Sequence, residues 1–128
     1  MTERQNVSSG TVWEKRVGYS RAVRVGNLVF VSGTTATDDE GNVVGTTTFE
    51  QAKFIFEKIE RSLKQVGAEM HHVVRTTMYV TDAKQWEGVG EAHNEFFADV
   101  RPVSTLVEVS ALIGDGYLVE IAVDAVMP

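Results

Sequence analysis

Two apolar runs near the C-terminus, 103–112 and 117–127, carry polar side chains in alternation with apolar ones, a pattern typical of β-strands. The Gly-Asp-Gly sequence at 114–116 predicts a tight turn that joins the two strands as a hairpin. Successive side chains of a strand point to opposite faces, so one face of this hairpin is expected to carry the polar groups. These groups are Ser104, Glu108, Glu120 and Asp124. Such a face must meet water, a cation, a ligand or another subunit.

Glu120 is the residue on this face that best suits catalysis, and two interpretations of it remain open. In the first, Glu120 is a strand carboxylate that pairs with a basic residue or faces solvent. In the second, it lies in a water-poor cleft between subunits and activates a water molecule as a general base, while nearby backbone amides stabilise charge. The alternation of polar and apolar residues does not choose between them.

Histidine and serine residues give weaker indications of chemistry. His71 and His72 are adjacent at the start of a predicted strand, so their rings should point to opposite faces and should not chelate one metal. His93 occupies an apolar position of a predicted helix, as a partly buried histidine with one hydrogen bond would. Neither Ser32 nor Ser104 lies in a Gly-x-Ser-x-Gly elbow. The sequence therefore predicts neither a zinc site nor a serine-hydrolase triad.

Length and composition limit the possible classes of protein. We expect one domain, 1–128, because the chain has 128 residues and 43% apolar content. There are no cysteines, which excludes disulfides and thiolate chemistry. The formal net charge of −6 disfavours nucleic acid as a partner, since such binding depends on neutralising phosphates. No signal sequence or membrane-spanning run is apparent, so a cytoplasmic protein without membrane contact is expected.

The remaining elements follow from periodicity and turn signals. Residues 1–10 are polar and predict a loose arm, and 11–17 predict a short strand. Gly26-Asn27 predicts a hairpin between 22–25 and 28–31. A helix should begin with a capping box made by Thr48 and Gln51 and should end at Gly67. The other predicted elements are a strand at 73–80 and a helix that begins after Asp82 and ends by Val100.

This order of elements predicts an α+β fold with a mixed sheet of about six strands. Two amphipathic helices can cover only one face of such a sheet. The other face mixes apolar residues, among them Leu106 and Leu118, with the carboxylates. We therefore expect it to be buried by further copies of the chain.

Several motifs together resemble the Rid (reactive intermediate deaminase) family, also called YjgF. They are Tyr-Ser-Arg-Ala-Val at 19–23, Phe-Val-Ser-Gly at 30–33, Val-Val-Arg-Thr-Thr-Met-Tyr-Val-Thr-Asp at 73–82, residues 105–112, and Leu-Val-Glu-Ile at 118–121. The resemblance implies a chorismate-mutase-like fold, a homotrimer and three clefts between subunits. It further implies hydrolysis of 2-aminoacrylate and related enamines or imines to 2-keto acids and ammonia, with no metal and no cofactor. Some members are labelled L-PSP endoribonuclease or translation inhibitor.

The resemblance also implies which residues form the cleft. Tyr19, Ser32 and Gly33 match the family's cleft positions, and Glu120 matches the catalytic carboxylate that positions the attacking water. Two positions depart from the pattern. Ser104 stands where deaminating members have an arginine that binds the substrate carboxylate, and Gly90 stands where an asparagine is common. The full set of expected substrate-binding residues is Tyr19, Ser32, Gly33, Gly90, Ser104 and Leu106.

Replacement of the arginine by Ser104 weakens the expectation of activity on standard 2-imino acids, because a hydroxyl gives one neutral hydrogen bond in place of two charged ones. Arg101 is expected to be a poor replacement, since it is three residues upstream with opposite strand parity, whereas Arg21 is a better candidate to enter the cleft. The sequence thus favours a homotrimer that binds a small molecule and hydrolyses another enamine or imine. A non-catalytic metabolite-binding trimer and an endoribonuclease remain alternatives.

Overall fold

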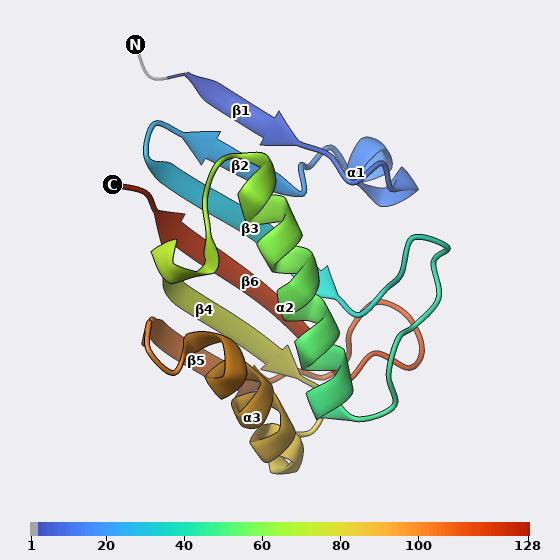
Figure 1. The fold of residues 1–128 in the computed structure, drawn as a ribbon. Helices are drawn as coiled ribbons and strands as arrows, with labels where there is room; N and C mark the ends of the chain where they lie inside the picture. Colours follow the sequence, from blue (N-terminus) through green and yellow to red (C-terminus); the bar gives the residue numbers. More distant parts are fainter. Residues whose placement is uncertain (1–2) are drawn as a thin grey trace.

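The computed structural model describes residues 3–128 and contains one six-stranded mixed sheet with its two long helices on one face (Figure 1). The predicted α+β architecture is thereby confirmed. The strands are β1 (Arg4–Val7), β2 (Ala22–Val25), β3 (Leu28–Thr35), β4 (Val73–Val80), β5 (Val103–Glu108) and β6 (Val119–Val126). The long helices are α2 (Thr48–Gln65) and α3 (Trp86–Phe97), and the short helical segments are α1 (Val12–Val17), η1 (Met70–His72) and η2 (Ala83–Gln85). No described helix is long and apolar enough to cross a bilayer.

The predicted hairpin of the last two strands is wrong, because β5 and β6 do not pair. The order across the sheet is β1-β2-β3-β6-β4-β5, so β4 separates them. Strand β6 is antiparallel to both β3 and β4, whereas β5 is parallel to β4. The physical reason is the helix between β4 and β5, which returns the chain across one face as a βαβ crossover and aligns the two strands in parallel. Gly114 and Gly116 consequently lie in a connecting loop, not in a hairpin turn.

This topology also corrects the expected polar face. On β4, Thr76 faces the helices and is buried, and its partner Ser104 on β5 therefore points to the same helix-covered side. Glu108, paired with buried Val80, lies on that side too. Glu120, which pairs with Tyr79, lies on the open side. Asp124, which pairs with Arg75, shares the open side with Glu120. The four polar side chains are thus divided between the two faces.

The N-terminal segment is more ordered than predicted. Residues 4–7 of the expected arm form β1, and the expected strand at 11–17 is helix α1. The buried Glu14 explains the helix, because its carboxylate accepts hydrogen bonds from Ser8, Ser9 and Thr11, which enclose the first helical turn. Gly18 ends α1 in the left-handed conformation, with a φ of 92°.

Helix α2 begins one residue earlier than the sequence predicted. The capping box is formed by Thr47 and Glu50, where the Thr47 hydroxyl accepts from the Glu50 amide and the Glu50 carboxylate accepts from the Thr47 amide. Gln51, the expected cap partner, is instead fully buried. Its side chain donates to the Gly45 and Gly116 carbonyls and accepts from the Leu118 amide. Gln51 therefore fixes the loop that leads into β6.

The first hairpin turn, the end of α2 and the start of the helical segment after Asp82 agree with the sequence prediction, whereas β3 continues to Thr35, beyond the predicted end at Val31, and β5 and β6 are shorter than predicted. The β2–β3 hairpin turns at Gly26, which has a φ of 62°. Gly67 follows α2 with a φ of 85°. Asp82 accepts from the Lys84 amide and caps η2, which leads directly into α3. The apolar stripe of α2 packs on the sheet through Ala52, Ile55, Phe56, Ile59 and Leu63, all with no exposed surface.

Replacement of Thr47 by alanine should lower the free energy of unfolding by about 1 kcal/mol, because the amide of Glu50 loses its acceptor at the start of α2. Urea denaturation measures this change. Glu57→Ala, which truncates an exposed side chain of the same helix, is the control and should change stability by less than about 0.5 kcal/mol. Equal stability of Thr47→Ala and the unmodified protein would show that this cap is not used.

Candidate functional site

The carboxylate of Glu120 lies directly over the backbone of Gly33. The β3–β6 pairing slips between Val31 and Thr34, so Ser32 and Gly33 form an irregular step in the sheet opposite Ala122, two residues from Glu120. A methyl group on Gly33 would overlap the Oε2 atom of Glu120. Glycine is thus required here by close approach, and the two predicted site residues are in contact.

Arg21 attaches the segment before β2 to the same irregular step. Its Nη2 donates to the Gly33 carbonyl at 2.7 Å, and its guanidinium carbon is 5.9 Å from the centroid of the Tyr19 ring. The Ser32 hydroxyl donates to the Ser20 carbonyl at 2.6 Å. Tyr19 keeps 40% of its surface exposed, whereas Arg21 is half-buried. The predicted residues Tyr19, Ser32, Gly33 and Glu120 are therefore brought together, and we call them, with Arg21, the Glu120 group.

Lys58 lies near this group, since the charge of Arg21 acts on it, although no sequence motif singled it out. Its Nζ donates to the carbonyls of Thr35 and Thr37, at 2.9 and 2.8 Å. Burial, together with the neighbouring charge of Arg21, lowers the pKa of Lys58 to about 8. No local sequence signal could have located it, because its partners are backbone carbonyls distant in the sequence.

A second set of predicted residues meets in a pocket of about 350 Å³ between α3 and β5. The pocket is lined by Gly90 and Ser104. A methyl group on Gly90 would lie 3.8 Å from the ring of Trp86. Leu106 belongs elsewhere, because it packs against the hydrophobic core. The pocket lining is Met78, Gly90, His93, Asn94, Phe97, Ala98, Arg101, Pro102 and Ser104.

A chain of hydrogen bonds links His93 on α3, through Thr76 on β4, to Ser104 on β5. The Thr76 hydroxyl donates to Ser104 Oγ at 2.8 Å and lies 2.8 Å from Nε2 of His93. The His93 ring packs against Phe56 and Phe97, with ring centroids 5.8 and 4.8 Å apart. Burial lowers the pKa of His93, so the ring is neutral near pH 7. The expectation of a partly buried histidine with a hydrogen-bond partner is confirmed.

Arg101 lines the same pocket as Ser104, contrary to the argument from strand parity. That argument fails because Arg101 precedes β5 and is not extended: its φ is 55°, in the left-handed region. Its amide donates to the Phe97 carbonyl at 2.9 Å, and its Nε donates to the Ala98 carbonyl at 3.2 Å. We call Arg101, Ser104, His93 and Gly90 the Ser104 group.

The two groups do not form one site within a single chain. Glu120 is on the open face of central strand β6, whereas Ser104 is on the helix-covered face of edge strand β5. Strand β4 lies between them. Any ligand that contacts both groups must therefore do so where two copies of the chain meet.

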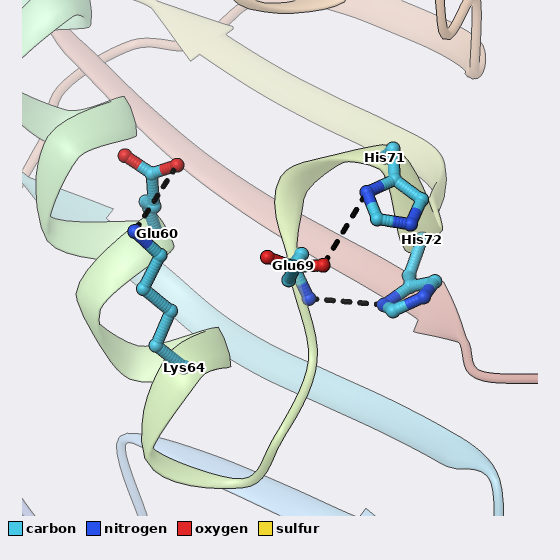
Figure 2. Close-up of polar contacts among 5 residues, drawn as sticks. All are labelled: Glu60, Lys64, Glu69, His71 and His72. Atoms are coloured by element: carbon cyan, nitrogen blue, oxygen red, sulfur yellow. Dashed lines mark hydrogen bonds and ion pairs between the residues drawn. The ribbon is translucent and has the colours of Figure 1, made fainter.

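The adjacent histidines also differ from expectation, because both rings lie beside Glu69 (Figure 2). They precede β4, in η1, and their ring centroids are 4.2 Å apart, so they do not point to opposite faces. His72 Nδ1 accepts from the Glu69 amide at 3.0 Å, and His71 Nδ1 is 3.7 Å from the Glu69 carboxylate. No cluster of three metal-ligating side chains occurs within residues 3–128.

The lowered pKa of His93 makes stability depend on pH. Below the ordinary histidine pKa of about 6.5 the unfolded chain takes up a proton that the folded chain resists, so stability present above that pH is lost as the pH falls toward the folded pKa. His93→Gln keeps a donor for Thr76 and does not titrate. Urea unfolding from pH 5 to 8 should show a smaller loss on acidification for the variant, and parallel curves would contradict this role.

Comparisons with known proteins agree with this architecture. The family model described as Endoribonuclease L-PSP matches residues 13–127. An uncharacterised protein of Streptomyces coelicolor is 35% identical over 121 residues, which cover 94% of this chain and 90% of the relative. A RutC family protein of Pyrococcus abyssi is 37% identical over 98 residues, covering 76% of this chain and 77% of the relative.

A solved structure shows the same fold. Rv2704 from Mycobacterium tuberculosis, a member of the YjgF/YER057c/UK114 family, has a TM-score of 0.90 and 47% sequence identity, and the match covers 98% of this chain and all of that one. The family match spans both the Glu120 group and the Ser104 group. The chain therefore belongs to the YjgF/RutC family, whose sequence model bears the name endoribonuclease L-PSP.

Proposed function

We propose that this protein is a homotrimer that binds a small metabolite in clefts between subunits and hydrolyses an enamine or imine. The observation that carries the proposal is the contact between Glu120 and Gly33, which places a carboxylate beside backbone on an open sheet face. The separation of the Glu120 group from the Ser104 group supports a cleft built by two copies. Membership of the YjgF/RutC family supports the class of reaction as an expectation.

The open face supports self-association. It exposes large apolar side chains on β3, β5 and β6, and a second copy of the chain would bury them. Their exposed fractions run from 39% to 64%. These side chains are Leu28, Phe30, Val103, Val107 and Val126. The half-buried Val23 and Val25 lie beside them on β2.

In the proposed reaction, Glu120 accepts a proton from a water molecule whose oxygen bonds to the carbon of the C=N group. The nitrogen gains protons and leaves as ammonia when the carbon–nitrogen bond breaks, and a carbonyl product remains. An enamine enters this sequence after it takes a proton on carbon and becomes the imine. The Gly33 amide and the Tyr19 side chain are proposed to hold the substrate.

The substrate is proposed to differ from a standard 2-imino acid. A serine at position 104 lacks the two parallel charged hydrogen bonds that a guanidinium gives to a carboxylate. Loss of such bonds weakens binding by about 1.5 to 3 kcal/mol and also removes an orienting contact. Standard 2-imino acids should therefore be poor substrates.

Glu120→Gln should reduce hydrolysis of imines by about 100-fold or more, because the amide cannot accept the proton from water. The assay generates imines in solution with an amine or amino-acid oxidase and follows their loss. Asp124→Asn, on the same face and the same strand, is the matched control and should keep the activity. Fast hydrolysis of standard 2-imino acids would contradict the role given to Ser104, and activity that persists in Glu120→Gln would contradict the role of Glu120.

In solution, the mass should be three times the 14.1 kDa of one chain. Light scattering coupled to gel filtration measures it. Phe30→Glu places a charge among the exposed apolar side chains of the open face and should shift the protein to smaller species, whereas Lys53→Glu on α2 should not. A monomer at micromolar concentration would contradict the proposed clefts.

A second candidate is a trimer that binds a metabolite without turning it over, favoured by the absence of an arginine at position 104. Ligands that raise the melting temperature and are recovered unchanged would support it. Ribonuclease activity rests on the family name alone and is disfavoured by the net charge of −6.

A further inference from the structure

Lys58 differs from the other lysines of the chain in its surroundings. Its side chain is half-buried, whereas those of Lys15, Lys53, Lys64 and Lys84 are exposed. Lys53 and Lys64 lie 3.7 and 3.9 Å from glutamate carboxylates. Within residues 3–128 Lys58 makes no ion pair, because the pairs found there involve other residues. Its amine therefore lacks the partner that most favours the charged form.

The backbone at the end of β3 holds the amine of Lys58 in one place. Nζ donates to the carbonyl of Thr35 at 2.9 Å and to that of Thr37 at 2.8 Å. Both acceptors are neutral, and an uncharged amine keeps two N–H groups, which are enough for both bonds. Loss of one proton therefore breaks neither hydrogen bond. It leaves a lone pair on Nζ that points away from the two carbonyls.

Positive charge gathers around this amine. Burial lowers the pKa of Lys58 to about 8, and the charges of Arg21 and Arg61 add to the effect. Arg61 follows Lys58 by three residues on α2, on the same face of the helix. Asp38 and Asp39, in the loop after β3, act in the opposite direction, although the Asp38 carboxylate already accepts from two backbone amides of its own loop. A desolvated lysine beside other cations is a nucleophile near neutral pH.

We propose that Lys58 is an acylation site, at which the amine takes the acyl group of a small acyl phosphate. Nζ forms a bond to the acyl carbon, the bond from that carbon to the bridging oxygen breaks, and inorganic phosphate leaves with the electron pair. The proton lost from Nζ goes to water. Arg21 and Arg61 favour this class of donor because they attract its anionic phosphate. The inference does not depend on imine hydrolysis, so either can fail without the other.

Acylation alters the backbone beside the Glu120 group. The product amide has one N–H and no charge, so it can hold only one of the carbonyls of Thr35 and Thr37. Thr35 is the antiparallel partner of Glu120 on β6. A modification on the helix-covered side thus reaches the strand position opposite the candidate catalytic carboxylate.

The experiment treats the intact protein with acetyl phosphate and follows each lysine by peptide mass spectrometry. At pH 7.5 Lys58 should be acetylated about tenfold faster than the exposed Lys15 and Lys84, because a larger fraction of its amine is uncharged. Its rate should level off above about pH 8, whereas the rates of the other lysines continue to rise. In urea, where the fold is lost, all the lysines should react at similar rates.

Variants test the surrounding charge and the effect on the fold. Arg61→Gln should slow acetylation of Lys58 several-fold, because it removes a charge that activates the amine and attracts the phosphate. Arg75→Gln, which removes an exposed arginine 3.9 Å from Asp124 on the open face, is the matched control and should leave the rate unchanged. Lys58→Arg keeps a charge and several donors but is not acylated. Acetyl phosphate should therefore lower the melting temperature of the unmodified protein more than that of this variant.

Acetylation of Lys58 no faster than that of Lys15 and Lys84 would overturn the proposal. A rate that rises steadily from pH 7 to 10, or a preference for Lys58 that persists in urea, would overturn it as well. Equal rates in Arg61→Gln and Arg75→Gln would contradict the role of the positive charge. Fast acetylation of Lys58 in a protein that hydrolyses no imine would uphold this inference and refute the proposed reaction, and imine hydrolysis without preferred acetylation would do the reverse.

Discussion

The position of β6 at the centre of the sheet determines where every candidate functional residue lies. Its buried side chains, Val119, Ile121, Val123 and Ala125, pack beneath α2, and antiparallel partners hold it on both sides. The intervening residues must then face the open side, which brings Glu120 to the irregular step of β3. Because both edges of β6 are occupied, β5 does not pair with it and instead lies at the sheet edge beside β4.

This arrangement also gives each group of residues a distinct support. The Glu120 group depends on the backbone of β3, where only glycine leaves room for the carboxylate, and on Arg21, which ties the preceding segment to the same step. The Ser104 group depends on packing between α3 and the sheet, which buries His93 and orders its hydrogen bonds. The first group is governed by backbone geometry and the second by side-chain packing.

Sequence periodicity predicted the fold class, the two long helices and the first hairpin, because these depend on local patterns. It did not predict which strands pair, since the order of β5, β4 and β6 depends on contacts between distant segments. That error placed Ser104 with Glu120. Arg101 was set aside for another reason, the assumption that it continues the strand, which its left-handed backbone contradicts. Glu14 illustrates a second kind of difficulty: its hydrogen bonds to Ser8, Ser9 and Thr11 turn an apparent strand into a helix. Family resemblance selected Tyr19, Gly33 and Glu120, whose contacts the structure then revealed.

The central claim is that a complete site needs the Glu120 group of one copy and the Ser104 group of another. Mixing the variants Glu120→Gln and Arg101→Gln after reversible dissociation tests it directly. If clefts form between copies, about a quarter of them in a random mixed trimer combine two unmodified groups. Activity on the preferred substrate should then recover to about that fraction, provided that each variant alone has lost its activity. No recovery in verified mixed trimers would show that both groups act within one chain.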